Sequence, residues 1–290
     1  MKRFFFYILL LHLIITGTFF FSIQQTQAVS ISPVKQTIII DAGGTGTVPL
    51  FVTNDTNSPL MIMPNADAFT LRENDQTILW NQPDPAVYWV ELPKVTDNIL
   101  PGETRQINFS ISIPEHTPPG AHYLGLFAEQ TDGAGQIHVK NRVGSLLFLH
   151  VAGTVSESIT LSQIETPSFI WWGDTQIDFT LTNTGNIHVF PTFHVIHTSF
   201  GKQTEEIKDG HDYSPLLAVA QQTETLFFPL TWNDVGKHTV AIDITYGATQ
   251  KHLTRTVTFW YIPIPIILGS IIILLFILWI IIKKRPKLVA

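Results

Sequence analysis

Much of the chain alternates between apolar and polar positions with a period of two. The clearest case runs from Ile107 to Ile113, where Ile and Phe alternate with Asn and Ser. Such alternation is typical of a β-strand with one buried face. Similar segments begin at Val48, Ile177 and Val240, and turns rich in Gly, Pro and Asn separate the strands. The pattern predicts an all-β region, without a convincing amphipathic helix.

The β-region contains two similar halves. In each half, a strand ending in Thr-Asn leads through a polar turn into a second strand, at Leu50–Asn54 and at Phe179–Asn183. Later in each half, a turn Gly followed by x-His opens another strand, at Gly120 and Gly236. Reuse of common turn residues is the alternative explanation. Short strands separated by such turns favour β-sandwiches. We expect two tandem immunoglobulin-like β-sandwich domains, comprising residues 29–155 and 156–261.

The stretch at residues 262–282 is apolar enough to cross a membrane. It has no charged residue from Ile266 to Ile282, and its length reaches the roughly 20 residues that span a hydrocarbon core. Trp260 and Tyr261 precede it, at the level where aromatic rings favour the interface. A buried core helix is the alternative, but it would show polar periodicity. Four basic residues of the kind that stay cytoplasmic follow in the tail, residues 283–290: Lys283, Lys284, Arg285 and Lys287.

The N-terminal 28 residues resemble a secretory signal peptide. Lys2 and Arg3 precede an apolar run, and a polar stretch ends at Ala28 with a small-x-Ala cleavage site. An uncleaved N-terminal anchor is the alternative, because the apolar run is long. Both ends predict one topology: a single-pass cell-membrane protein with an extracellular ectodomain and a cytoplasmic C-terminus.

Composition restricts the partners of this ectodomain. Residues 29–262 hold eleven Lys and Arg against 23 Asp and Glu, a net charge of −12. A domain this acidic is unsuited to binding nucleic acid through phosphates or to lying on an anionic membrane. The chain has no cysteine, so neither disulfides nor thiolate metal sites can form, and the ectodomain must be stabilised by its cores.

We expect no enzymatic activity, cofactor or metal. The eleven histidines invite a search for zinc ligands, but His194 and His197 are three apart and would face opposite sides of a strand. His188 and His194 share a face, yet no carboxylate pair stands nearby in sequence to complete a site. Nucleophile elbows, HExxH and phosphate-binding glycine loops do not occur.

Aromatic residues provide the candidate binding site. Trp80, Tyr88 and Trp89 lie in a proline-rich segment that ends at Pro93 and has the character of a long loop or broken edge strand. Flat rings on a rigid loop suit sugar faces and protein hot spots alike. The alternative is that the two Trp rings plug the end of the sandwich. For Trp171-Trp172, at a strand end, we favour the core interpretation.

A set of motifs in the first half occurs in a characteristic order. The motifs are Ile31-Ser-Pro33, Leu100-Pro-Gly-Glu103, Ile113-Pro114, Pro119 to Phe127 and Arg142 to Leu147. This order resembles the N-terminal peptidoglycan-binding domain of the WxL-interacting proteins, surface proteins of Gram-positive bacteria. The family's plan adds a second immunoglobulin-like domain, a membrane span and a basic tail. The chain has no Trp-x-Leu triplet, so the resemblance makes it the partner of a Trp-x-Leu protein. The Trp80–Pro93 segment has no match, and no ligand contacts map onto named residues.

Three functions are consistent with these features. The first is a membrane-anchored cell-surface scaffold that attaches to cell-wall peptidoglycan, as the resemblance implies, and to a surface protein partner. The alternative is a purely protein-binding immunoglobulin-like assembly or chaperone module that acts by strand addition, without glycan binding. A hydrolase is the third, and the missing catalytic motifs disfavour it.

Overall fold

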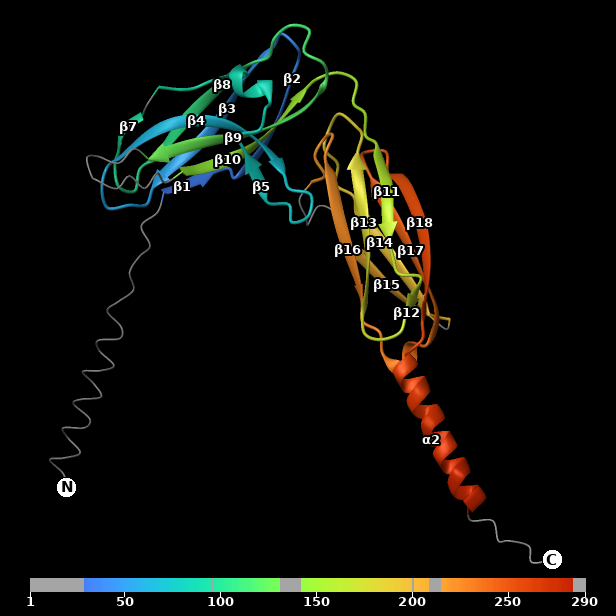
Figure 1. Ribbon diagram of the computed structural model, residues 1–290. Coiled ribbons are helices and arrows are strands. Elements are labelled where there is room, and N and C mark those ends of the chain that lie inside the picture. The colour runs from blue at the N-terminus through green and yellow to red at the C-terminus, as the bar shows by residue number, and fades with distance from the viewer. Residues whose placement is uncertain (1–28, 95, 131–141, 200, 209–214, 284–290) are drawn as a thin grey trace, which may run out of the picture.

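The computed structural model describes residues 29–94, 96–130, 142–199, 201–208 and 215–283. These residues form mainly β-strands, with a single α-helix at their C-terminal end. The strands build two sandwiches in series, and the helix leaves the far end of the second (Figure 1). The predicted signal peptide and the basic residues Lys284, Arg285 and Lys287 lie outside the described residues.

The first sandwich has the strand order of the immunoglobulin fold. One sheet is ordered β1-β3-β8-β6: Val29–Ser32, Thr45–Asn54, Thr104–Ser112 and Val90–Glu91. The facing sheet is ordered β2-β10-β9-β4-β5: Lys35–Ile40, Arg142–Val151, Gly120–Gln130, Leu60–Leu71 and Ile78–Trp80. The short β7, Thr96–Ile99, also pairs with β4. β2 runs parallel to β10, whereas β9 and β10 are antiparallel. Strand β6 occupies the position of strand D, beside β8.

The second sandwich repeats this plan with fewer strands in one sheet. That sheet is ordered β11-β13-β16: Ile159–Glu165, Thr175–Asn183 and Gln221–Phe228. The other is ordered β12-β18-β17-β14-β15: Phe169–Ile170, Lys251–Tyr261, Gly236–Tyr246, Thr192–Ser199 and Lys202–Lys208. As in the first sandwich, the chain switches sheets early and pairs in parallel with the last strand, here β18. Among the described residues, nothing corresponds to β6.

Each sandwich encloses its own hydrophobic core. In β8 the alternation predicted from sequence is confirmed, because Ile107, Phe109 and Ile111 are buried between more exposed neighbours. The same alternation buries Val240, Ile242 and Ile244 of β17 in the second core. The period-two pattern therefore separates the core face of each strand from its solvent face.

A buried Asn closes the equivalent turn in both sandwiches. Asn54 ends β3 and Asn183 ends β13, and both are fully buried. Each side-chain amide donates to the carbonyl four residues later and to a carbonyl on a distant segment. The acceptors are Ser58 and Ile99 for Asn54, at 2.8 Å each, and Ile187 and Leu216 for Asn183, at 2.8 and 3.2 Å. Each Oδ1 accepts from the backbone N–H two residues on. The repeated Thr-Asn motif therefore has the same structural role twice.

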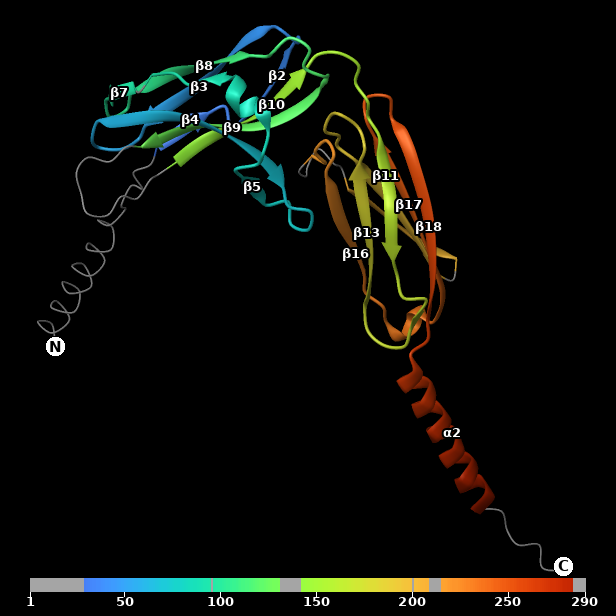
Figure 2. The same cartoon turned by 45° about the horizontal axis from the view of Figure 1, so that its top comes forward.

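Aromatic side chains pack where the two sandwiches meet. Phe69, Tyr123 and Phe148 of the first sandwich form a buried cluster with Leu217 of the second. The Tyr123 hydroxyl accepts a hydrogen bond from the Ala218 N–H at 2.9 Å. The β4–β5 hairpin reaches toward β16 (Figure 2), where Glu73 O accepts from Thr223 N at 3.2 Å.

The turn after β13 joins the sandwiches from the other side. Asn186 Nδ2 donates to Pro119 O at 3.0 Å and to Thr154 O at 2.9 Å. Its own carbonyl accepts from Ala121 N at 2.8 Å. The polar turn after Asn183, which sequence analysis treated as part of the repeat, thus also holds the two sandwiches together.

Two histidines are half-buried at this contact. His188 packs against the rings of Tyr123 and Phe148, at 5.9 and 4.9 Å between centroids. His150 Nε2 lies 3.4 Å from His188 Nδ1. Burial, followed by the nearby His150 and Lys35 charges, lowers the pKa of His188 to about 4. Burial also lowers the pKa of His150 and of Lys35. Burial at the contact therefore disfavours the positively charged forms of these side chains.

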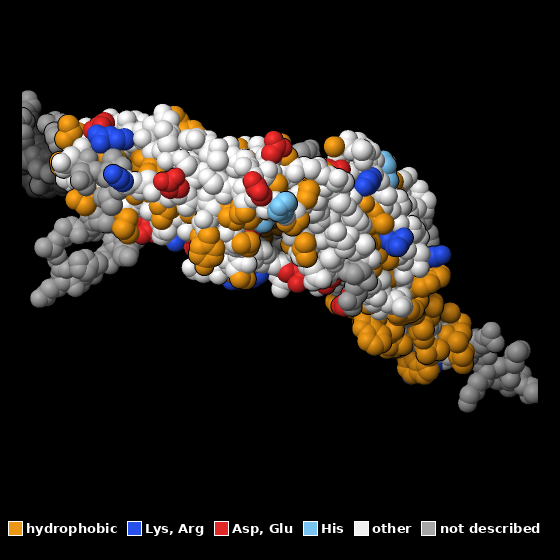
Figure 3. Space-filling model, turned by 90° about the horizontal axis from the view of Figure 1, so that it is seen from above, with side chains coloured by type: hydrophobic (Ala, Val, Ile, Leu, Met, Phe, Trp, Pro, Cys, Tyr) orange, Lys and Arg blue, Asp and Glu red, His pale blue; other side chains and the backbone are white. Residues whose placement is uncertain are grey.

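The helix α2, Ile264–Lys283, is long and apolar enough to span a membrane, and none of its residues is buried. Its hydrophobic side chains form one continuous surface, whereas those on the visible face of the sandwiches are scattered (Figure 3). Lys283 ends the helix, with Nζ 4.9 Å from the centroid of the Trp279 ring. A soluble core helix would bury a stripe of such residues, so this exposure favours the transmembrane interpretation.

Candidate binding surfaces

The segment from Trp80 to Pro93 folds as a short strand, a turn of helix and another short strand. Trp80 of β5 packs edge-on against Phe69 and Phe127, with centroids 5.5 and 4.9 Å apart. The Arg142 guanidinium lies 5.1 Å from the Trp80 ring. Trp80 is therefore held within a cluster of rings on the first sandwich, with only part of its surface open to solvent.

The 3-10 helix η1, Pro85–Trp89, has a fixed geometry. Asp84 caps it by accepting from Ala86 N at 2.8 Å, and its carboxylate also lies 2.8 Å from His122 Nδ1. Trp89 is half-buried, packs against the first core and meets the His122 ring at 4.6 Å. Tyr88 is 90 % exposed. Of the three predicted binding residues, only Tyr88 projects into solvent. Trp89 packs against the first core, and Trp80 packs against the aromatic cluster between the two sandwiches. Their role in binding stays a prediction.

A groove forms in the second sandwich because its sheets differ in width. Five strands face three, so the inner face of β15 extends past the edge of β16. The resulting groove has a volume of about 540 Å³. Its floor is formed by alternate residues of two strands: Val195, His197 and Ser199 of β14, and Lys202, Thr204 and Glu206 of β15. Phe227, Phe228 and Pro229 form one wall, and Asn233 and Asp234 close one end.

The backbone of β16 is accessible along this groove. Thr223 N donates to Glu73 O and therefore points away from β13. Because backbone groups of successive strand residues alternate in direction, the N–H and C=O of Thr225 and Phe227 point to the same outer side. In the part of the chain that the structure describes, no strand pairs with this side of β16. The Phe227 ring beside it is 72 % exposed.

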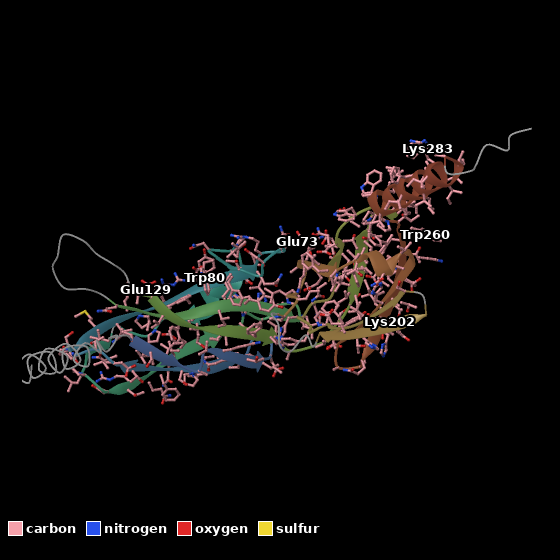
Figure 4. The ribbon with its side chains drawn as sticks, turned by 90° about the horizontal axis from the view of Figure 1, so that it is seen from below. Glu73, Trp80, Glu129, Lys202, Trp260 and Lys283 are labelled. Carbon is pink, nitrogen blue, oxygen red and sulfur yellow. The ribbon has the colours of Figure 1, made fainter. Side chains whose placement is uncertain are left out.

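The opposite edge of the groove is less suited to pairing. β15 has the sequence Lys-Gln-Thr-Glu-Glu-Ile-Lys, and charged edge strands discourage intermolecular pairing. Lys202 projects from this edge, far from the first sandwich (Figure 4). By contrast, β16 ends in Leu-Phe-Phe. Pairing with an additional strand is therefore expected at β16.

A histidine pair lies at the end of the groove. His238 Nε2 is 2.6 Å from Asp234 O, which can only accept, so this nitrogen carries a proton. In neutral His238, Nδ1 then accepts from His197 Nε2–H, 2.9 Å away. Burial, followed by the charge of His238, lowers the pKa of His197. The groove thus presents a neutral imidazole at neutral pH.

Metal chemistry receives no support from the described residues, in which no group of three or more His, Cys, Asp or Glu side chains could hold an ion. His188 contacts the first sandwich, a contact that the sequence alone does not reveal. The other candidate, His194, lies on β14 of the second sandwich. The absence of enzymatic activity and of a cofactor stays a prediction.

No protein-family model matches the chain, and no curated protein matches it either. Similar solved structures include the class 5 fimbriae chaperone CfaA, with 10 % identity, a TM-score of 0.47 and coverage of 79 % of this chain and 98 % of that chain. The Pseudomonas aeruginosa CupB2 chaperone has 12 % identity, a TM-score of 0.35 and coverage of 78 % and 98 %. The Salmonella enterica SafA pilin–SafB chaperone complex has 11 % identity, a TM-score of 0.38 and coverage of 82 % and 98 %. At these scores the likeness assigns neither a family nor a function.

Sequence analysis did not single out the groove. Its residues come from three strands and a 3-10 helix, η3 (Trp232–Asp234), which only the fold brings together. One signal was present in the sequence: Phe227 and Phe228 are adjacent, so in a strand one of them must face outward. The structure places Phe228 in the core and Phe227 in solvent.

Proposed function

We propose that this protein is an exported, membrane-anchored module that binds an extended segment of a protein partner as an additional strand along β16. The observation that carries this proposal is the outer edge of β16 at Thr225 and Phe227, with which no described strand pairs, beside an apolar groove. Thr225 and Phe227 supply backbone groups for the new ladder. The incoming strand takes the place that β6 occupies in the first sandwich, and thereby covers β15.

Strand addition explains both features of the site. Main-chain hydrogen bonds provide affinity without regard to sequence, whereas pockets for alternate side chains provide selectivity. Here every second side chain of the added segment enters the groove, over Val195 and His197 and against Phe228. The partner segment is therefore expected to alternate apolar and polar residues. A charge pointing inward is accepted only near Lys202 or near Glu206, which lie at opposite ends of the β15 row on the groove floor.

The experiment selects ten-residue peptides from a displayed library on the ectodomain, residues 29–262. Thr225→Pro removes an N–H that points outward, so it blocks the added ladder and leaves the β13 pairing intact. Thr225→Ala is the matched control: it also loses the 2.6 Å bond from Thr225 Oγ1 to Asp178 but keeps the N–H. Selected peptides should bind the wild type and Thr225→Ala, and lose affinity for Thr225→Pro.

Hydrogen exchange provides a second measurement. Bound peptides should slow exchange at the amides of Thr225 and Phe227, since these donate to the new strand. Peptides that bind Thr225→Pro as well as the wild type, without protecting these amides, would refute strand addition at β16.

Anchoring by α2 is part of the proposal. It is supported by the length of the apolar helix (20 residues), the absence of any buried residue in it and the terminal Lys283. The proposed orientation puts both sandwiches outside the cell and the C-terminus in the cytoplasm, following the positive-inside bias. Full-length protein should incorporate into lipid nanodiscs, and a chain truncated after Ile262 should remain outside them.

Glycan binding by the first sandwich is the second candidate, and the exposed Tyr88 ring is the observation that favours it. The cap at Asp84 and the packing of Trp89 hold this ring on a rigid support. Sedimentation with purified peptidoglycan sacculi tests the idea. Tyr88→Ala should release the ectodomain from the sacculi without changing its melting temperature. Equal sedimentation of wild type and Tyr88→Ala would exclude this site.

A further inference from the structure

Two tryptophans that sequence analysis interpreted as core residues are exposed instead. Trp171 is 66 % exposed and Trp172 61 % exposed. They follow β12 in a turn that passes through Gly173, whose φ of +79° favours glycine. The neighbouring residue Ile170 takes the buried position of this short strand. The core interpretation was wrong because the strand ends one residue before the pair.

Two further rings lie beside them. Phe169 of β12 and Trp260 of β18 are register partners, and each is 49 % exposed. Tyr261 next to Trp260 is buried in the second core, so it is not the interfacial ring that its position in sequence suggested. We name Phe169, Trp171, Trp172 and Trp260 the basal aromatic patch.

The patch lies where the chain enters α2. Ile262 N donates to Ile170 O at 2.8 Å, directly before Trp171. The helix begins at Ile264, and two residues span at most about 7 Å. Trp260 is drawn beside the start of α2 in Figure 4. If α2 crosses a bilayer, these rings come to the depth of the lipid headgroups.

The position of the patch beside the start of α2 indicates that lipid covers it. Trp rings are enriched at membrane interfaces because the ring is apolar while its N–H needs a polar partner. A soluble domain rarely gathers several large exposed rings without a contact to cover them. Lys237, the register partner of Trp260, is exposed beside it on the same face of the sheet, and its charge suits phosphate groups.

We propose that the basal aromatic patch inserts into the headgroup region of the outer leaflet and seats the second sandwich on the membrane. This inference rests on the proposed anchoring by α2. The groove lies near the patch. Phe228 of the groove wall pairs with Thr175, which is three residues after Trp172 of the patch. The groove therefore opens close to the bilayer surface, and its partner segment approaches from a membrane-proximal position.

The absence of cysteine from the chain permits a direct test with single nitroxide labels on the full-length protein in nanodiscs of zwitterionic phosphatidylcholine, which does not repel the acidic ectodomain. Trp172→Cys reports on the patch. Thr256→Cys is the matched control, since it lies exposed on β18, four residues before Trp260 and on the same face. Leu274→Cys, in the middle of α2, reports on incorporation. Collisions with oxygen, which enriches in lipid, are compared with collisions with a water-soluble nickel chelate.

The ratio of oxygen to nickel collisions should be several-fold higher at position 172 than at 256, and highest at 274. A low ratio at 274 means that α2 is not inserted, in which case the proposed anchoring fails. A high ratio at 274, with equal ratios at 172 and 256, overturns the seating proposal alone. Spin–spin broadening at 172 that disappears on dilution with unlabelled protein also overturns it, because the patch would then join two copies of the chain.

Discussion

The two sandwiches share a strand order but differ at one edge. In the first, β6 pairs with β8, and Val90 enters the core beside Ile111. In the second, no described strand pairs with that side of the corresponding strand β16, where only the Thr223 N–H is bonded, to Glu73 of the β4–β5 hairpin. The same plan thus gives a closed sandwich in one half and a groove of about 540 Å³ in the other.

Because only the second sandwich leaves this edge unpaired among the described strands, that edge is a better candidate for binding than any feature that both sandwiches share. Shared features, such as the buried Asn54 and Asn183, are needed for the fold in both halves and carry no information on a ligand. In the first sandwich β6 covers this edge, whereas in the second no described strand takes the equivalent position beside β16. An extended partner segment can fill it with the geometry that β6 already demonstrates.

The largest expected effect tests whether each half depends on its own core. Ile111→Asp and Ile242→Asp each bury an unpaired charge at a fully buried position, which should cost about 4 kcal/mol or more. Limited proteolysis should show loss of the first sandwich in one variant and of the second in the other. Ser110→Asp, on the outer face of β8, is the control and should be tolerated. Loss of both halves in either variant would show that they fold as one unit.

The buried asparagines test whether the shared turn contributes equally to the stability of the two sandwiches. Asn54→Ala and Asn183→Ala each leave two carbonyls and a turn N–H without their partner, and each should destabilise its sandwich by about 3 kcal/mol. Urea unfolding followed by hydrogen exchange in each half provides the measurement. Effects that differ by more than a factor of two would mean that the second sandwich, with its open edge, relaxes where the first cannot.

A smaller effect is expected at the contact between the halves. The pKa of His188 is about 4 in the folded protein, against 6.5 for a free imidazole. The separated or unfolded state therefore binds more protons between these values. The stabilisation is complete above pH 6.5 and is lost as the pH falls toward 4, by about 2 kcal/mol after allowance for partial exposure.

His188→Phe keeps a ring against Phe148 and removes the titration. Small-angle scattering from pH 7 to 4.5 should show opening of the wild type and less opening of the variant. His252→Phe, at an exposed position outside the contact, is the control. Identical scattering curves for wild type and His188→Phe across this range would show that His188 does not govern the contact.

Sequence analysis predicted the strands where burial has a simple period. The run from Ile107 to Ile113 is such a case, because the side chains of a strand alternate between core and solvent whatever their tertiary partners. It could not place Trp171 and Trp172, whose burial depends on where β12 ends. For Trp80 and Trp89 it left both alternatives open, and the structure shows two rings that pack against neighbouring side chains and remain partly exposed.

The sequence by itself determined the mostly β character, the repeated Thr-Asn turns and the apolar C-terminal helix, since each follows from local periodicity or composition. Only the tertiary structure decided the groove along β16, the histidine pairs and the basal aromatic patch. These depend on distances between strands that are remote in the chain and on the number of strands in each sheet. Neither quantity has a local signature, because an open edge and a paired edge can have the same alternation of side chains.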